Sequence, residues 1–498
     1  MNNQDSDRNI NEGDDSNESH QLALLHTKED DDDDDDDDYR SVVQLSSSNT
    51  ADFHSLARRL RNLESDRIDL LNLYHLCLDY NEAHEVIGQL YRFREVRLDD
   101  CFGDSEYLIL EQVFQHSSIQ RFEYVCSQED GPPDIIASIF SRGLQGAAHG
   151  LKELCLRVCM TPAFTQALLF DGINQSLSTQ DWTSISFLNI LDLSQCEFTS
   201  PDSITALCSG LQENVGLTDL IFENCHLNDD ELKEIVNSIV QHPTLKKLSL
   251  ALNYAGSNTI EAVATLLYSQ TQNTITPSRT GTLEHLNLGQ QSPGHLRNVH
   301  LIYRALEHNN TLKSMCLCEN YLHRSQLPQL VQALEMNETL EELNLEDCDF
   351  RKEGIETLLA SLSRYPFLRK LWLRKNMTPQ SEESLDLSDT LLDQMKDNDV
   401  IQLLDVDEEW ILDTQKKIQI DDFLHLNRCG RRFLKTPIEN DRFPLGMWPV
   451  LIERAQKLSL KRNEDSAVES QEWKQKNARI SLHTTMFLLL RGPALCQR

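Results

Sequence analysis

The sequence predicts an α/β solenoid in which a short strand and a helix recur and stack into a horseshoe, with a parallel concave sheet and convex helices. Three observations favour this fold class. A nine-residue template, L-x-x-L-x-L-x-x-(N/C), returns throughout the middle of the chain. Most copies start 28 or 29 residues apart. Apolar residues at helical spacing fill the intervals between copies.

Copies of the template fix the extent of the solenoid, which we place at residues 73–410. Weaker copies extend the series at Leu73, Phe93, Ile119 and Ile401. Two longer steps, of 37 residues from Leu151 and of 38 residues from Leu245, indicate inserted loops. The polar segment 269–281 in the second of these units is either a mobile loop or a recognition loop. The eight clear copies begin at Leu151, Leu188, Leu217, Leu245, Leu283, Leu312, Leu340 and Leu368.

The residues of each repeat unit predict a strand, a helix and a turn between them. Leucines that alternate with polar residues predict a short strand with one buried face, and Leu232, Ile235 and Ile239 have the spacing of a helix. The Asn or Cys that ends the template is expected to bond the buried backbone groups of the following turn. A zinc site made of these cysteines is disfavoured, because one thiol per unit forms a line while zinc needs four ligands at one point. We expect neither a metal nor another cofactor.

The template, the 28/29 alternation and the phrases QHPTL, EHNNTL and EMNETL before the strands resemble the ribonuclease-inhibitor type of leucine-rich repeat protein. The resemblance covers residues 73–407. It implies protein recognition by the concave surface. The C-terminal phrases LNRxGRR and PLGxWP are similar to a tail of algal repeat proteins of the same type, which adds family membership but no activity.

The N-terminal segment differs in composition. Residues 1–50 carry sixteen acidic and three basic residues, a net charge of 3 − 16 = −13, with few apolar residues. We therefore expect residues 1–52 to be a disordered acidic arm, which is either a solubilising tail or an electrostatic lure or mask. Residues 53–72 have apolar residues three to five apart and are expected to form a capping helix.

The C-terminal region is expected to close the last strand. We place a helical cap at residues 411–460, followed by a charged segment and a terminal helix at residues 461–498. Phe423 and Leu426 loosely resemble the first apolar positions of the suppressor-of-cytokine-signalling box. That resemblance implies the alternative of a ubiquitin-ligase substrate receptor. The usual cysteine is replaced by Asn427.

Charge and targeting signals restrict the partners and the compartment. The net charge of −34 argues against nucleic acid and favours a protein or peptide partner, basic ones included. Neither a signal peptide nor a membrane-spanning stretch is apparent, so we expect an intracellular protein, cytoplasmic or nuclear, that does not bind membranes. The oligomeric state is left open.

Residues between and beside the strand leucines are expected on the concave face, and Trp372 is the first candidate for a binding anchor. In a parallel stack, Glu342 would lie beside Lys370 and Glu346 beside Arg374, so these charges either neutralise each other or form part of a partner-binding patch. The candidate partner-binding residues are Asp219, Glu223, Glu342, Glu346, Lys370, Trp372 and Arg374.

The sequence contains none of the phosphate-loop, zinc-protease, nucleophile-elbow or CxxC motifs that signal catalysis. We therefore expect a non-enzymatic protein-binding scaffold or adaptor, with no catalytic residues. The main enzymatic alternative is a GTPase-activating protein of the Ran type, because that family shares the repeat type and an acidic tract. In this chain the acidic run comes before the repeats instead of after them.

Overall fold

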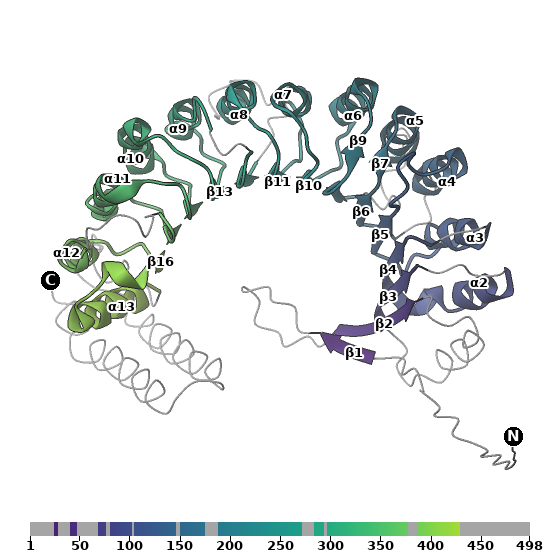
Figure 1. Ribbon diagram of the computed structural model, residues 1–498, viewed down its shortest axis with the longest axis horizontal. Coiled ribbons are helices and arrows are strands. Elements are labelled where there is room, and N and C mark those ends of the chain that lie inside the picture. Colours follow the sequence, from purple (N-terminus) through teal and green to yellow (C-terminus); the bar gives the residue numbers. More distant parts are fainter. Residues whose placement is uncertain are drawn as a thin grey trace, which may run out of the picture.

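A computed structural model describes residues 24–27, 40–46, 68–75, 80–101, 104–145, 150–174, 188–270, 283–292, 296–376 and 386–428. Strands and helices alternate along the chain and follow an open arc, with the strands on the inner side and the helices on the outer side (Figure 1). This long parallel sheet, alternating with helices, is compatible with a repeat solenoid.

One 14-stranded sheet runs through the described residues in chain order, with β7 and β9 set apart as a small second sheet. Its first two strands pair antiparallel, and all its later pairs are parallel. The strands are β1 (Leu24–Thr27), β2 (Arg40–Ser46), β3 (Ile68–Tyr74), β4 (Phe93–Asp99), β5 (Arg121–Val125), β6 (Glu153–Arg157), β7 (Cys159–Met160), β8 (Ile190–Asp192), β9 (Glu197–Phe198), β10 (Asp219–Ile221), β11 (Lys247–Ser249), β12 (His285–Asn287), β13 (Ser314–Cys316), β14 (Glu342–Asn344), β15 (Lys370–Trp372) and β16 (Leu403–Asp405).

Helices of the described residues line the outer side of the arc (Figure 1). A π-helix (Ala167–Ile173) continues α5, and short 3-10 turns lie at Leu90–Arg92, Arg324–Gln326, Leu362–Arg364 and Glu408–Trp410. The α-helices are α2 (Tyr80–Ile87), α3 (Asp104–Val113), α4 (Asp134–Gln145), α5 (Pro162–Gln166), α6 (Pro201–Glu213), α7 (Asp229–Ser238), α8 (Ser257–Ser269), α9 (His300–Leu306), α10 (Leu327–Met336), α11 (Arg351–Leu359), α12 (Ser388–Asp397) and α13 (Thr414–Arg428).

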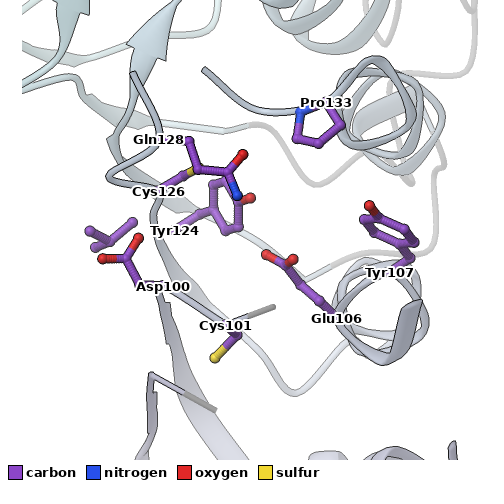
Figure 2. Close-up of a pocket in the computed structure, with 9 residues that line it drawn as sticks. Asp100, Cys101, Glu106, Tyr107, Tyr124, Cys126, Gln128 and Pro133 are labelled. Carbon is purple, nitrogen blue, oxygen red and sulfur yellow. The ribbon is translucent and has the colours of Figure 1, made fainter. Parts of the chain in front are cut away.

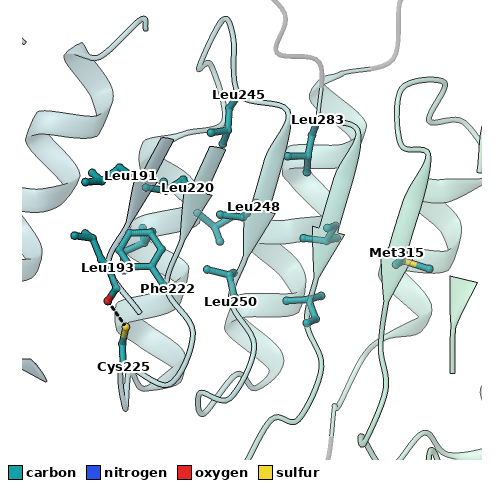
Figure 3. Packing of buried hydrophobic residues seen from close by; sticks show 14 of the residues in the cluster. Leu191, Leu193, Leu220, Phe222, Cys225, Leu245, Leu248, Leu250, Leu283 and Met315 are labelled. Carbon is teal, nitrogen blue, oxygen red and sulfur yellow. Dashed lines mark hydrogen bonds between the residues drawn. The ribbon is translucent and has the colours of Figure 1, made fainter. Parts of the chain in front are cut away.

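The template leucines form the core, as the sequence predicts. In the central strands, Leu220 pairs in register with Leu191 on one side and with Leu248 on the other. All three side chains are fully buried, and the leucine or phenylalanine two residues later is buried as well (Figure 3). Each unit therefore contributes the same apolar layer, which only stacking on its neighbours removes from water.

The Asn or Cys that ends the template bonds the backbone of the turn, which confirms the expectation. The Asn253 side-chain amide donates to the carbonyls of Phe222, Leu250 and Ala251, and its oxygen accepts from the amides of Cys225 and Leu227. Where the template has cysteine, the thiol donates instead. The thiol of Cys225 reaches the carbonyl oxygen of Leu193 at 3.0 Å (Figure 3).

A second ladder of buried polar residues lies at the other end of the strands, in the loops that precede them. The Asn337 amide nitrogen donates to the carbonyls of Leu306 and Asn309, and its oxygen accepts from the amides of Thr339 and Leu340. Equivalent positions are filled by Asn214, His242, Gln270, Asn309, Asn398 and Asn427, all of them buried. Two ladders thus satisfy backbone groups at both ends of the short strands.

The N-terminal end departs from two expectations. Residues 68–72 were expected in a capping helix, but Ile68–Tyr74 form β3, which pairs with β4. The step of three from Ile68 to Leu71 fits a helix and the repeat template equally, and pairing with β4 decides for the strand. The first template copy therefore starts at Ile68 instead of Leu73. Residues 53–67 lie outside the described residues.

Two segments of the acidic arm carry secondary structure. β1 pairs antiparallel with β2, and β2 pairs in parallel with β3, with Val42 opposite Leu70. These strands, at residues 24–27 and 40–46, differ from the expectation of an arm that is disordered throughout. The rest of residues 1–52 lies outside the described residues.

α13 contacts α12 and covers the end of the sheet at β16 (Figure 1). Ile420 and Leu424 join the core, and the Asn427 amide donates to the carbonyls of Asn398 and Ile401. The amide nitrogen of Asn427 thus repeats the donor half of the second ladder, while its oxygen is buried without a hydrogen-bond partner. α13 packs where one more unit would follow. Residues 429–498, with the rest of the expected cap and terminal helix, lie outside the described residues.

Candidate functional site

The inner face consists of the strand side chains that alternate with the buried leucines. Because the pairing is in register, these side chains form rows across the sheet. One row runs through Asp219, Lys247, His285, Ser314, Glu342 and Lys370, and the next through Ile221, Ser249, Asn287, Cys316, Asn344 and Trp372. The register of the parallel strands therefore fixes which side chains are neighbours on this face.

Charges near the C-terminal end of the sheet pair across strands. Lys370 Nζ lies 3.0 Å from Glu342 Oε1, as the predicted neighbourhood implies. The second predicted pair is wrong. Arg374 Nε lies 2.7 Å from Asp405 Oδ1, whereas Glu346 Oε1 lies 2.8 Å from Lys375 Nζ. Asp405 belongs to β16, a weaker copy of the template, and its proximity to Arg374 depends on the register of that last strand.

Trp372 lies between these ion pairs. It is half-buried, while its strand neighbours Leu371 and Leu373 are fully buried. In the sheet it lies opposite Asn344 on one side and Asp405 on the other. Burial raises the pKa of the Asp405 carboxyl, although Arg374 opposes the shift. Trp372 is thus a partly exposed aromatic side chain with charged neighbours on the inner face.

Asp219 and Glu223 lie elsewhere on the inner face. β11, β12 and β13 separate their strand from the one that carries Glu342. Asp219 Oδ2 accepts from the Thr218 hydroxyl at 2.6 Å, and Glu223 Oε1 accepts from the Ser249 hydroxyl at 2.5 Å. The seven predicted residues therefore form two groups: an acidic pair near the middle of the sheet, and a mixed cluster around Trp372.

Sequence reasoning missed a third charged group, on the N-terminal strands. Arg97 bridges Asp99 at 2.7 Å and Glu123 at 3.4 Å. Further pairs join Arg121 to Glu153 and Arg157 to Asp192. Their template copies were recognised, so alternation within the strands could have placed these side chains on the inner face. Each of these charged groups thus has an opposite charge beside it on the sheet.

A small cavity opens between the end of β4, the helix α3 and the loop after β5 (Figure 2). It measures about 60 Å³, which is room for a few water molecules. Burial raises the pKa of the Glu106 carboxyl in its wall to about 7, while a hydrogen bond with Tyr124 lowers it in part. The cavity is too small for an organic substrate. Its lining residues are Asp100, Cys101, Glu106, Tyr107, Tyr124, Val125, Cys126, Gln128 and Pro133.

Two further findings concern the described residues. Across the described ranges, His, Cys, Asp and Glu side chains nowhere gather in threes or more at distances that would hold a metal ion. Within those ranges, none of the helices combines the length and the apolar composition that crossing a bilayer requires.

Comparisons with known proteins identify no family for this chain. No family model matches the chain, and no curated protein sequence matches it. Among solved structures, the chain is similar to leiomodin-1 actin-binding site 2, with 12% sequence identity and a TM-score of 0.23 over 45% of this chain and 89% of that one. A likeness this weak supports no conclusion about function.

Proposed function

We propose that this protein is a leucine-rich repeat horseshoe of the ribonuclease-inhibitor type that works as a non-enzymatic protein-binding scaffold or adaptor. Its inner face would bind a protein or peptide segment, with the cluster of Trp372, Glu342, Lys370 and Arg374 as the main contact. One observation carries the proposal: a half-buried tryptophan stands on a rigid strand beside two cross-strand ion pairs.

Energetic considerations support this cluster over the rest of the inner face. Its ion pairs are partly exposed, so each contributes only about 0 to 1 kcal/mol to the fold. Trp372 exposes apolar area that a partner could cover, and aromatic anchors of this kind dominate binding energies. Asp219 and Glu223 already accept hydrogen bonds from neighbouring hydroxyls, so their oxygens are less free to receive a partner's basic groups.

The partner we propose is a protein or peptide with some basic character, because the chain carries a large negative excess. We also propose that the protein works inside the cell. Ten cysteines of the described residues are free thiols, and in the repeat ladders they donate to backbone carbonyls as thiols. A reducing compartment preserves such thiols.

Crosslinking in native lysate, with a photo-reactive side chain placed at Asn344 beside Trp372, should identify the partner. Binding of that partner is then measured for Trp372→Ala and for Tyr268→Ala, which removes an exposed aromatic residue from the outer helix α8. We expect Trp372→Ala to weaken binding at least tenfold, which corresponds to about 1.4 kcal/mol. Tyr268→Ala should leave binding unchanged.

Two results would contradict the proposal. One is unchanged affinity of Trp372→Ala together with a large loss of thermal stability, which would make Trp372 a core residue. The other is equal weakening by both variants, which would place the contact away from the inner face.

A further inference from the structure

Two cysteines face each other on the inner face, near the middle of the regular units. Cys316 is the last residue of β13, and Cys318 follows two residues later on the same side. Their sulfur atoms lie 3.2 Å apart, and both side chains are partly exposed. Leu317 between them is fully buried. The geometry thus presents a dithiol on the open side of the sheet.

This pair differs from the cysteines of the repeat ladder. Cys196, Cys225 and Cys348 are buried, and each donates its S–H to a backbone carbonyl of the preceding unit. Burial raises the pKa of Cys225 to about 12, so its thiol stays protonated and inert. Cys316 and Cys318 are instead partly exposed, and Cys316 Sγ donates to Cys318 Sγ rather than to a carbonyl of the preceding unit.

The neighbouring strands place small or amide-bearing residues beside the sulfurs. Asn287 and Asn344 lie opposite Cys316 in the register of β12 and β14. Gly289 lies next to Cys318, and a Cβ atom on Gly289 would come within 2.9 Å of the Cys318 sulfur. Any other residue at position 289 would thus crowd this sulfur, so the glycine lets Cys318 keep its place beside Cys316.

We propose that Cys316 and Cys318 form a binding site for a soft monovalent metal ion, Cu(I). Two thiolates are soft ligands of the kind that select Cu(I), and Cu(I) accepts coordination by two sulfurs. Zinc would need about four ligands, and the described residues supply no third His, Cys, Asp or Glu at this point. Binding releases both thiol protons, so the two thiolates with one Cu(I) carry a net charge of −1.

The test titrates the full-length protein with Cu(I) alone, without oxygen, against a chromogenic Cu(I) chelator. We expect one tight equivalent in the wild type. The variant carrying Cys316→Ser and Cys318→Ser should bind its tightest Cu(I) at least a hundredfold more weakly. Cys208→Ser, which changes a partly buried cysteine of α6, should bind like the wild type.

A second measurement uses the wild type only, so it does not depend on the folding of a variant. Thiol alkylation is mapped by mass spectrometry with and without one equivalent of Cu(I). The metal should protect Cys316 and Cys318 and leave the alkylation of Cys208 unchanged. Equal alkylation of Cys316 and Cys318 with and without Cu(I), or equal affinity in the double serine variant, would overturn the proposal.

Discussion

The units around β4, β5 and β6 are stabilised differently from those around β10 to β15. The N-terminal units pack a cluster of aromatic rings, in which Phe140 lies 5.3 to 6.1 Å from the rings of Phe114, Phe122, Tyr124 and Phe164. The later units have leucine cores, and their turns are stabilised by the buried amides of Asn253, Gln291, Asn320 and Asn376.

The two regions show two ways of stabilising the stack. A side-chain amide that bonds three or four backbone groups fits only when successive turns have the same geometry. The length of the unit matters less, because Gln291 repeats the bonding of Asn253 after a step of 38 residues. In the N-terminal units, large rings fill the core instead, and their packing tolerates several relative orientations.

Removal of the central ring should have the largest effect. Phe140 is fully buried on α4 and contacts four other rings, so Phe140→Ala leaves a cavity that the neighbours cannot fill. We expect a loss of about 3 to 5 kcal/mol in the free energy of unfolding, measured by chemical denaturation. Phe140→Leu should lose clearly less. Equal losses for Ala and Leu would contradict a role for the aromatic packing.

Removal of a ladder amide should have the next largest effect, although it deletes few apolar atoms. Asn253→Ala leaves the carbonyls of Phe222 and Leu250 and the amide of Cys225 without this partner. We expect a loss of about 2 to 4 kcal/mol, since each buried group left unbonded costs about 1 to 3 kcal/mol. Asn310→Ala, at an exposed position, is the matched control and should change stability by less than about 0.5 kcal/mol. A loss for Asn253→Ala no larger than that of the control would show that the ladder contributes little.

The regular units also account for the features that could be predicted from the sequence. The template leucines, the helices at Leu232 and Ile355 and the role of Asn253 follow from the period, because equal units repeat the same environment. The strand at Ile68 was missed, because a step of three residues does not distinguish a helix from the template. On the inner face, the register predicted Glu342 beside Lys370, whereas Arg374 pairs with Asp405 of β16, and Glu346 pairs with Lys375. The weak template copy at Ile401 hid the strand that supplies Asp405.

One position of the second ladder holds a histidine where the others hold amides. The stability of this region should therefore depend on pH. His242 is buried, and its Nε2 lies 3.2 Å from the side-chain oxygen of Asn214. Its Nδ1 is buried without a hydrogen-bond partner. Burial lowers the pKa of His242 from 6.5 to about 4. The neutral ring therefore fits the ladder, and the charged ring does not.

The smallest expected effect is a dependence of stability on pH. In the unfolded chain His242 takes up a proton below about pH 6.5, while in the folded chain it stays neutral down to about pH 4. The free energy of unfolding therefore has its full value above pH 6.5. It decreases as the pH falls from 6.5 toward 4, because only the unfolded chain gains the proton. Between pH 7 and pH 5 the loss should be about 2 kcal/mol, measured as the difference in unfolding free energy between wild type and His242→Asn at each pH.

His308→Asn, at an exposed site, should show no such difference. If the wild type and His242→Asn lose stability in parallel between pH 7 and pH 5, the pKa of His242 is the same in the folded and the unfolded chain, and the ladder tolerates its charge.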